Sequence, residues 1–201
     1  MSELERGHEI GCIVRAQVQV RNLKVPGPRF RGYDPSGIVP VQALQLDDGG
    51  VAGIREAGER LADVHHRDHP ESKNRGDNGI SIGFTSHYAM MRARFPGGIE
   101  DGAAGENLLI ETGRTWSASA LAGGLVVRTA DGPVRLAQVI VADPCVEFSR
   151  WILDFPPTER PDTTVADALR FLGDGVRGLY ARLEGTTATI SVGDLVELAA
   201  G

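Results

Sequence analysis

Short alternating runs of apolar and polar residues dominate the chain, and glycine, proline or acidic residues separate them. The first run, Ile10 to Val20, reads IGCIVRAQVQV and predicts a strand that leads into a long loop, PGPRFRGYDPSG. Alternation returns from Ile38 to Leu46 and stops at the turn-forming residues Asp47 to Gly50. The N-terminal part therefore predicts two strands, the second with room for a bulge.

Two segments carry apolar residues at helical spacing instead. The segment from Phe84 to Phe95 predicts a helix, with the hydroxyl of Thr85 or Ser86 available as the N-cap. The segment from Asp162 to Leu172 predicts a second, short helix, with Asp162 or Thr163 as its cap and Gly173 at its end.

The other apolar runs are short and indicate a mainly β architecture. Stretches 107–111, 124–130 and 134–142 read as strands, and three more are expected between 178 and 200. The polar stretch 54–79 predicts at best a short helix followed by a long loop. Many short strands with two or so short helices favour a closed β-barrel over a doubly wound α/β fold.

Composition and charge narrow the function classes. The 201 residues, 41% of them hydrophobic, suffice for one domain that spans residues 1–201. We expect a soluble, cytosolic protein, because no apolar run is long enough to cross a membrane and the N-terminus lacks a secretory pattern. A formal charge of −6 argues against general nucleic-acid binding. Arginine far outnumbers the two lysines, Lys24 and Lys73, which suits phosphate recognition but also fits a genomic codon bias.

Cysteine and histidine are the candidate metal ligands. Cys12 and Cys145 are expected as free thiols, and two cysteines cannot form a four-cysteine zinc site. His65 and His69 are four residues apart, so a helix would let both bind zinc. Pro70 follows directly without apolar periodicity, which favours a polar loop and leaves zinc as the alternative.

Two further features carry candidate chemistry. Gly105-Glu106-Asn107-Leu108 places an acid and an amide in a turn, either as a ligand-orienting pair or as an ordinary turn. Cys145 follows Pro144 after the strand 134–142, where pairing is expected to stop. Its thiol can then face a cleft, or it can be packed as a small hydrophobe, an interpretation that fits Cys12 better.

The order and spacing of three segments resemble the MOSC family, named for the C-terminal domain of molybdenum cofactor sulfurases. They are GAAGENL at Gly102 to Leu108, Asp143-Pro144-Cys145, and RGLYAR at Arg177 to Arg182 together with Val192-Gly193-Asp194. The resemblance extends over roughly Leu61 to Leu198. It implies a β-barrel with a site for molybdenum cofactor.

The resemblance also implies roles for individual residues. Cys145 would ligate molybdenum or carry sulfur as a persulfide, with Gly105, Glu106 and Asn107 beside it, and Arg75 would be a candidate for holding the cofactor phosphate. The chain departs from the family in the stretch HHRDHPESKNRGDNG, where many bacterial members have a His-Gly-Gly-Pro turn. No pyridoxal phosphate is expected, since neither lysine lies in a recognisable motif.

Three functions remain as hypotheses. The first is an oxidoreductase component that reduces N-hydroxylated small molecules, with electrons from a separate donor protein because no flavin, haem or iron–sulfur motif is visible. The second is a sulfur carrier that receives persulfide sulfur on Cys145 from a cysteine desulfurase. The third is a non-enzymatic barrel that binds a small molecule and in which Cys145 is simply packed.

Overall fold

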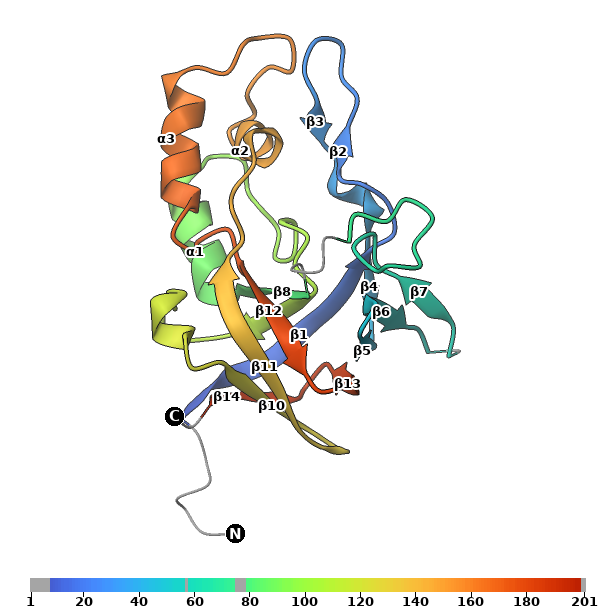
Figure 1. The fold of residues 1–201 in the computed structure, drawn as a ribbon. Coiled ribbons are helices and arrows are strands. Elements are labelled where there is room, and N and C mark those ends of the chain that lie inside the picture. Colours follow the sequence, from blue (N-terminus) through green and yellow to red (C-terminus); the bar gives the residue numbers. More distant parts are fainter. Residues whose placement is uncertain (1–7, 57, 75–78, 200–201) are drawn as a thin grey trace.

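A closed β-barrel forms the centre of the protein (Figure 1). The computed structural model describes residues 8–56, 58–74 and 79–199. Within these ranges the barrel strands are β1 (Glu9–Gln19), β8 (Ile80–Phe84), β9 (Leu108–Glu111), β10 (Leu125–Thr129), β11 (Gly132–Val141), β12 (Leu179–Glu184) and β14 (Leu195–Leu198). Their order is β14, β10, β11, β12, β8, β9 and β1, and pairing of β1 with β14 closes the ring. The predicted mainly β, closed-barrel fold is confirmed.

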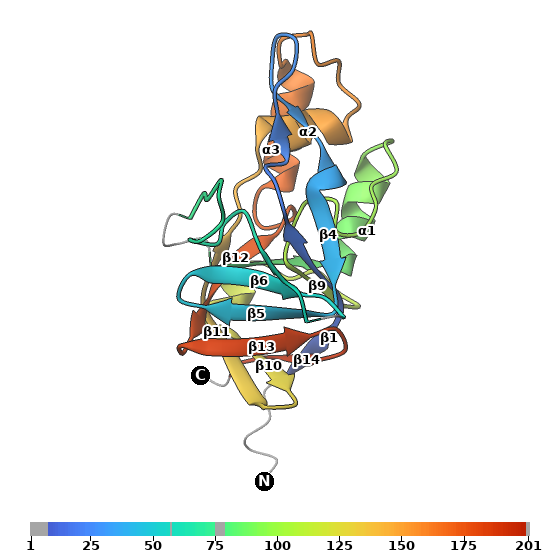
Figure 2. The same ribbon diagram turned by 90° about the vertical axis from the view of Figure 1, so that its right-hand side faces the viewer.

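A smaller sheet and three helices surround the barrel. The sheet has the order β13 (Thr187–Ser191), β5 (Ala43–Asp47), β6 (Gly50–Ile54) and β7 (Arg60–Ala62), and Figure 2 shows its face. Strand β4 (Ile38–Val41) pairs with the far end of β1. Figure 1 shows the helices gathered at one end of the barrel with a hairpin: they are α1 (Thr85–Arg94), α2 (Val146–Ile152), α3 (Thr163–Leu172) and the hairpin strands β2 (Lys24–Val25) and β3 (Gly32–Tyr33). In the described ranges, no helix combines the length and apolar character that a membrane span requires.

Two apolar clusters fill this architecture. Inward-facing residues of the barrel strands, such as Ile13, Ile82 and Leu136, form the barrel core. A second cluster, which includes Tyr88 and Phe148, joins the three helices to the β2–β3 hairpin. Burial of large apolar side chains in both clusters is the main stabilising contribution. The boundary between the barrel and the second cluster is where the candidate site lies.

The predicted strand Ile38–Leu46 is two strands. The strand is interrupted at Gln42. Its N–H donates to Ile54 O in β6, and its carbonyl accepts from Val192 N. Because of this break, β4 stays in the barrel sheet and β5 enters the second sheet. The alternating pattern is right for both strands, but it does not reveal the change of sheet.

The prediction for 54–79 needs correction. Its described part contains no helix: strand β7 pairs with β6, and a series of turns follows. The helix at Phe84–Phe95 is confirmed as α1, but its side-chain cap is absent, since Phe84 is the N-cap residue. The Thr85 hydroxyl instead accepts from Thr112 N, which ties α1 to the segment after β9.

The elements after α1 match the sequence pattern closely, whereas the hairpin strands β2 and β3, which fall at the predicted loop, and strand β8 have no counterpart in the prediction. Of the two predicted caps of α3, Asp162 is the N-cap residue and accepts from Thr164 N and Val165 N, and Gly173 ends that helix as predicted. Strands β9 to β14 occupy the predicted stretches. Helix α2 has no counterpart in the prediction, because its seven residues are too short to give a clear period.

Candidate functional site

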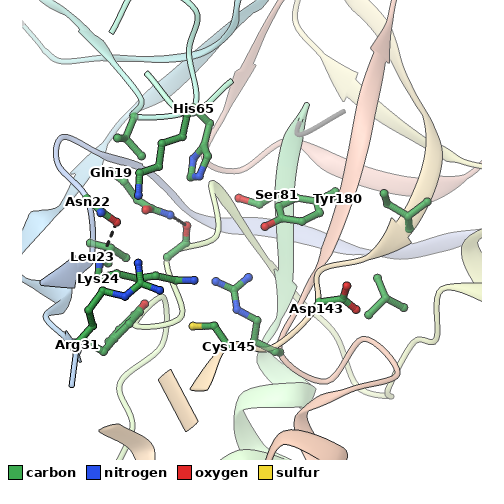
Figure 3. A pocket seen from close by; sticks show the side chains of 17 residues that line it. Gln19, Asn22, Leu23, Lys24, Arg31, His65, Ser81, Asp143, Cys145 and Tyr180 are labelled. Atoms are coloured by element: carbon green, nitrogen blue, oxygen red, sulfur yellow. Dashed lines mark hydrogen bonds between the residues drawn. The ribbon is translucent and has the colours of Figure 1, made fainter. Parts of the chain in front are cut away.

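A cavity of about 540 Å³ opens where the barrel meets the second apolar cluster (Figure 3). This volume is within the range of small-molecule sites. Its walls come from the end of β1, the β2–β3 hairpin, the loop after β7, strand β8, the end of β11 and the segment before β12. The lining residues are Gln19, Asn22, Leu23, Lys24, Arg31, Tyr33, Val64, His65, Lys73, Ser81, Gly105, Ile140, Val141, Asp143, Cys145, Arg177 and Tyr180.

The cavity is positively charged although the chain as a whole is acidic. Lys24, Arg31, Lys73 and Arg177 line it, and among the described lining residues Asp143 is the one carboxylate. The formal charge of the whole chain is −6, so the cations are concentrated rather than evenly spread. A concave surface that concentrates one sign of charge attracts ligands of the opposite sign. This lining suits an anionic ligand.

Cys145 reaches the cavity because strand β11 bends before it ends. The pairing of β11 with β12 shifts register between Ala137 and Ile140, and Gln138 between them has a φ of 53°. Such a bulge redirects a strand. Pairing stops at Val141, as Pro144 predicts, and Cys145 then becomes the N-cap of α2. The chain thus delivers the sulfur to the cavity wall.

The Cys145 sulfur is surrounded by donors and charges. The backbone N–H of Phe148 donates to Sγ at 3.4 Å. The thiol contributes a hydrogen bond to the carboxyl of Glu147, which lies 2.8 Å from an Arg31 nitrogen and 3.6 Å from Lys24 Nζ. Burial pushes the pKa of Glu147 up, but its own backbone N–H and the two cations outweigh this and lower it. Glu147 therefore stays ionised and links the thiol to the cationic wall.

Arg177 is the cation deepest in the site. Its Nη2 donates to Ala104 O at 2.8 Å, whereas its buried Nε has no hydrogen-bond partner among the described residues. Burial acts to lower the pKa of Arg177, but the effects of Tyr180, Tyr33 and Cys145 outweigh it and raise the pKa. A charged guanidinium with an unused buried N–H is costly unless a partner binds it. Arg177 adds its positive charge to the cavity wall.

Gly105 lines the cavity, and its conformation strongly favours glycine. Its φ is +82°, and an added Cβ would lie 2.8 Å from both Gln19 Nε2 and Leu23 Cδ1. The carbonyl of Gly105 accepts from Gln19 Nε2 at 2.7 Å. The glycine thus lets the turn before β9 approach β1 closely.

Glu106 and Asn107 lie behind the wall rather than in it. Both side chains are buried, and neither lines the cavity. Glu106 Oε2 accepts from the Tyr88 hydroxyl at 2.9 Å, while Oε1 has no partner in the described part of the chain. Burial raises the pKa of Glu106 to about 7, against the opposing effects of its own backbone N–H, Tyr88 and Arg177. Glu106 is thus a buried acid that titrates near neutral pH.

Asn107 connects three parts of the site. Its Oδ1 accepts from the backbone and hydroxyl of Ser81 at 3.1 and 2.8 Å. Its Nδ2 donates to Gln17 O at 3.2 Å and to Asp63 Oδ2 at 3.0 Å. The amide therefore uses both of its polar atoms to hold β8, β1 and the loop after β7 together.

The described part of the histidine loop, residues 63–74, is held by hydrogen bonds of its own. His69 Nε2 lies 3.2 Å from Val20 O, and His66 Nε2 lies 3.1 Å from Asp47 Oδ1. His65 and His69 are not on a helix. In the ranges that the structure describes, no three His, Cys, Asp or Glu side chains are placed to hold one metal ion. The favoured polar loop is correct over residues 63–74, and the zinc alternative is wrong for these residues.

Other candidate residues lie elsewhere. Both cysteines are free, as predicted. Cys12 does not line the cavity and is half-buried on β1, with Sγ 3.9 Å from the Glu111 carboxylate, so it is less enclosed than the sequence led us to expect. Arg75 lies outside the described residues.

The family assignment agrees with this geometry. The family model of the MOSC domain matches residues 64–197. The chain belongs to the MOSC domain family. This family is associated with molybdenum cofactor. No curated protein matches the chain.

Solved structures share the fold of this MOSC domain. The YuaD protein from Bacillus subtilis aligns with a TM-score of 0.53 and 14% identity, over 95% of this chain and 94% of that one. YiiM from Escherichia coli aligns with a TM-score of 0.51 and 13% identity, over 94% of this chain and 70% of that one. At these identities the similarity establishes the fold alone.

Sequence reasoning missed most of the cationic wall. Lys24 and Arg31 lie in the loop after the first strand, where four basic residues between 21 and 31 are a signal that was available. Arg177 was recognised as part of a motif but received no role. His65 and Asp143 could not be assigned, because the loop paths that bring them to the MOSC cavity follow from tertiary packing.

Proposed function

We propose that this MOSC domain binds molybdenum cofactor in the cavity and reduces N-hydroxylated small molecules there. Cys145 is the molybdenum ligand in this proposal, and a separate protein donates electrons. The observation that carries it is a half-buried thiol in a cavity that Lys24, Arg31 and Arg177 also line. A thiolate is a soft donor suited to molybdenum, and lysine and arginine are suited to a phosphate.

The residues present fit this cofactor. The cavity of about 540 Å³ has room for a small-molecule cofactor, and its charge matches a phosphate-bearing group. Lys24 and Arg31 would hold the phosphate, and the charge of Arg177 in the same wall would attract another polar atom of the pterin. When bound, the molybdenum supplies the two-electron redox chemistry.

The wall opposite the cations suits the substrate. Figure 3 shows Asp143 and Tyr180 on one side of the cavity and Lys24 and Arg31 on the other, with Cys145 between them. A carboxylate and a phenol offer an acceptor and a hydroxyl to the nitrogens of an N-hydroxylated base or amidoxime. The Asp143 side would therefore orient substrate, while the Lys24 side retains cofactor.

Cofactor content tests this proposal directly. The wild type, Cys145→Ala and Cys12→Ala are purified from a host that makes the cofactor, and molybdenum and pterin are measured by elemental analysis and fluorescence. We expect both in the wild type and in Cys12→Ala, which removes a thiol outside the cavity, and loss of molybdenum from Cys145→Ala. Arg31→Gln should lower pterin content. Equal molybdenum in all proteins, or none in any, would refute the ligand role.

A second candidate function is sulfur transfer. The Phe148 N–H that donates to Sγ would support the Cys145 thiolate, which is the nucleophile that sulfur transfer needs. In that reaction the Cys145 thiolate takes the outer sulfur of a desulfurase persulfide, and the desulfurase thiolate leaves. Incubation with a cysteine desulfurase and cysteine should then add one sulfur atom to the Cys145 peptide in mass spectra, and none to the Cys12 peptide. An unmodified Cys145 excludes the sulfur-transfer role. If the protein also binds no molybdenum, the barrel would be a non-enzymatic binding domain.

A further inference from the structure

Asp63 and His65 form a carboxylate–imidazole pair at the cavity. Asp63 Oδ1 lies 2.8 Å from His65 Nδ1 and accepts from the His65 backbone N–H at 2.9 Å. A carboxylate at this distance accepts the Nδ1 proton, which assigns the neutral ring to the tautomer with a lone pair on Nε2. No described residue forms a hydrogen bond with Nε2.

Asp63 is held rigidly. Its side chain is 1% exposed, and Oδ2 accepts from Asn107 Nδ2 at 3.0 Å and from the Gln19 backbone N–H at 2.8 Å. A carboxylate with all these donors cannot rotate without losing hydrogen bonds. The imidazole of His65 is consequently fixed in orientation through Asn107 and Asp63, as functional groups supported by neighbouring hydrogen bonds are.

The exposed end of this pair belongs to the cavity. His65 is 29% exposed at the side chain and lines the cavity. Figure 3 shows His65 and Cys145 across the cavity from each other, with both side chains directed into it. Solvent can therefore reach the ring when the cavity is empty, and a ligand that fills the cavity would contact it.

The neighbouring histidines provide a contrast within the same loop. His66 has Nε2 near Asp47 and Arg60, and its Nδ1 accepts from Asp68 N. His69 likewise has both ring nitrogens engaged, by a backbone carbonyl and a backbone N–H. Both are structural, whereas His65 keeps one nitrogen for a ligand.

We propose that His65, oriented by Asp63, is the proton donor of this site. This inference rests on the proposed reductive function. Reduction of an N-hydroxylated compound breaks the N–O bond, consumes two electrons and two protons, and releases water. In its protonated form His65 donates one proton from Nε2 to the departing oxygen and becomes neutral, and the second proton and the recharging of His65 come from solvent. The electrons come from the donor protein of the proposed function.

The first test needs neither cofactor nor turnover. Diethyl pyrocarbonate acylates unprotonated imidazole nitrogens, and peptide mass spectra give the rate at each histidine. We expect His65 to react several times faster than His66 or His69, and inorganic pyrophosphate to slow His65 selectively. Equal rates at all three, or no protection by pyrophosphate, would overturn the proposal.

The second test uses the holoprotein with benzamidoxime as the probe and reduced methyl viologen as the artificial donor. His65→Gln should lower kcat about 100-fold, the order that general acid catalysis contributes, with little change in KM. Added imidazole should restore activity to His65→Gly, which a purely structural role does not predict. His8→Gln, an exposed histidine outside the cavity lining, should match the wild type.

The two tests separate the possible failures. An active wild type with an equally active His65→Gln protein refutes the role of His65 and leaves the proposed function intact. A cofactor-loaded wild type that does not reduce benzamidoxime refutes the proposed function. In that case the acylation rates and the pyrophosphate protection still decide whether His65 is the imidazole that contacts the ligand.

Discussion

Glu106 makes the protein's stability depend on pH in a way that one substitution can isolate. Its carboxyl is buried, and burial raises its pKa from 4.5 to about 7. Between these two values the folded state holds a proton that the unfolded state has lost, so the free energy of unfolding falls as pH rises. A change from 4.5 to about 7 corresponds to about 3 kcal/mol. Stability from this group is thus fully present below pH 4.5 and is lost as pH rises to about 7.

Glu106→Gln removes the titration and keeps the shape. Its amide oxygen can still accept from Tyr88, as the Glu106 carboxyl does. The free energy of unfolding of both proteins is measured by urea denaturation from about pH 4 to about pH 8. As pH rises, the value for the variant should increase by about 3 kcal/mol relative to that of the wild type. Glu184→Gln, an exposed glutamate 58% accessible and paired with Arg135, should show no comparable gain. If the free energies of unfolding of Glu106→Gln and the wild type change in parallel with pH, the neutral buried form of Glu106 is refuted.

Three other substitutions test single features by the free energy of unfolding in urea. Gly105→Ala should lower the free energy of unfolding by about 2 kcal/mol, because it places a non-glycine residue in the left-handed region and brings its Cβ to 2.8 Å from neighbouring side chains. Gly193→Ala is the control and should lose less, because its φ is +95° but the space around it is open. Asn107→Ala should lose about 3 kcal/mol, because four hydrogen bonds disappear and buried partners are left unsatisfied. Asp162→Ala should lose about 1 kcal/mol with the N-cap of α3, and a control at the exposed Asp167 should change little; equal losses would contradict the capping argument.

The fold was predictable where one segment determines its own structure. Helix α3 has an apolar face, a capping Asp162 and a terminal Gly173, all within one short stretch. Helix α1 has a weaker apolar face, with Tyr88 and Met91 buried, and no side-chain cap, because the hydroxyls of Thr85 and Ser86 bond to the segment after β9. Residues that suit a cap thus serve a tertiary contact when a partner lies nearby, and the sequence alone does not show that partner.

The site was predictable to the same limited degree. Cys145 could be placed at a strand end, since Pro144 and the apolar run before it are adjacent in sequence. Asn107 could be identified as important, but its partners Asp63 and Gln17 are 44 and 90 residues away. Its role in holding two strands and a loop together depends on the closed barrel, which local patterns do not specify in detail.

The cavity is lined by residues from two parts of the chain, one inside the region that the MOSC model matches and one before it. The residues matched by the MOSC model, 64–197, supply Cys145, Asp143 and Arg177. Lys24 and Arg31 precede that match, on and between the strands of the β2–β3 hairpin. Glu147 of α2 pairs with both of them, so a residue of the matched region holds the hairpin over the cavity. Changes in the hairpin can therefore alter the charge of the cavity without replacing the cysteine or the barrel strands that present it.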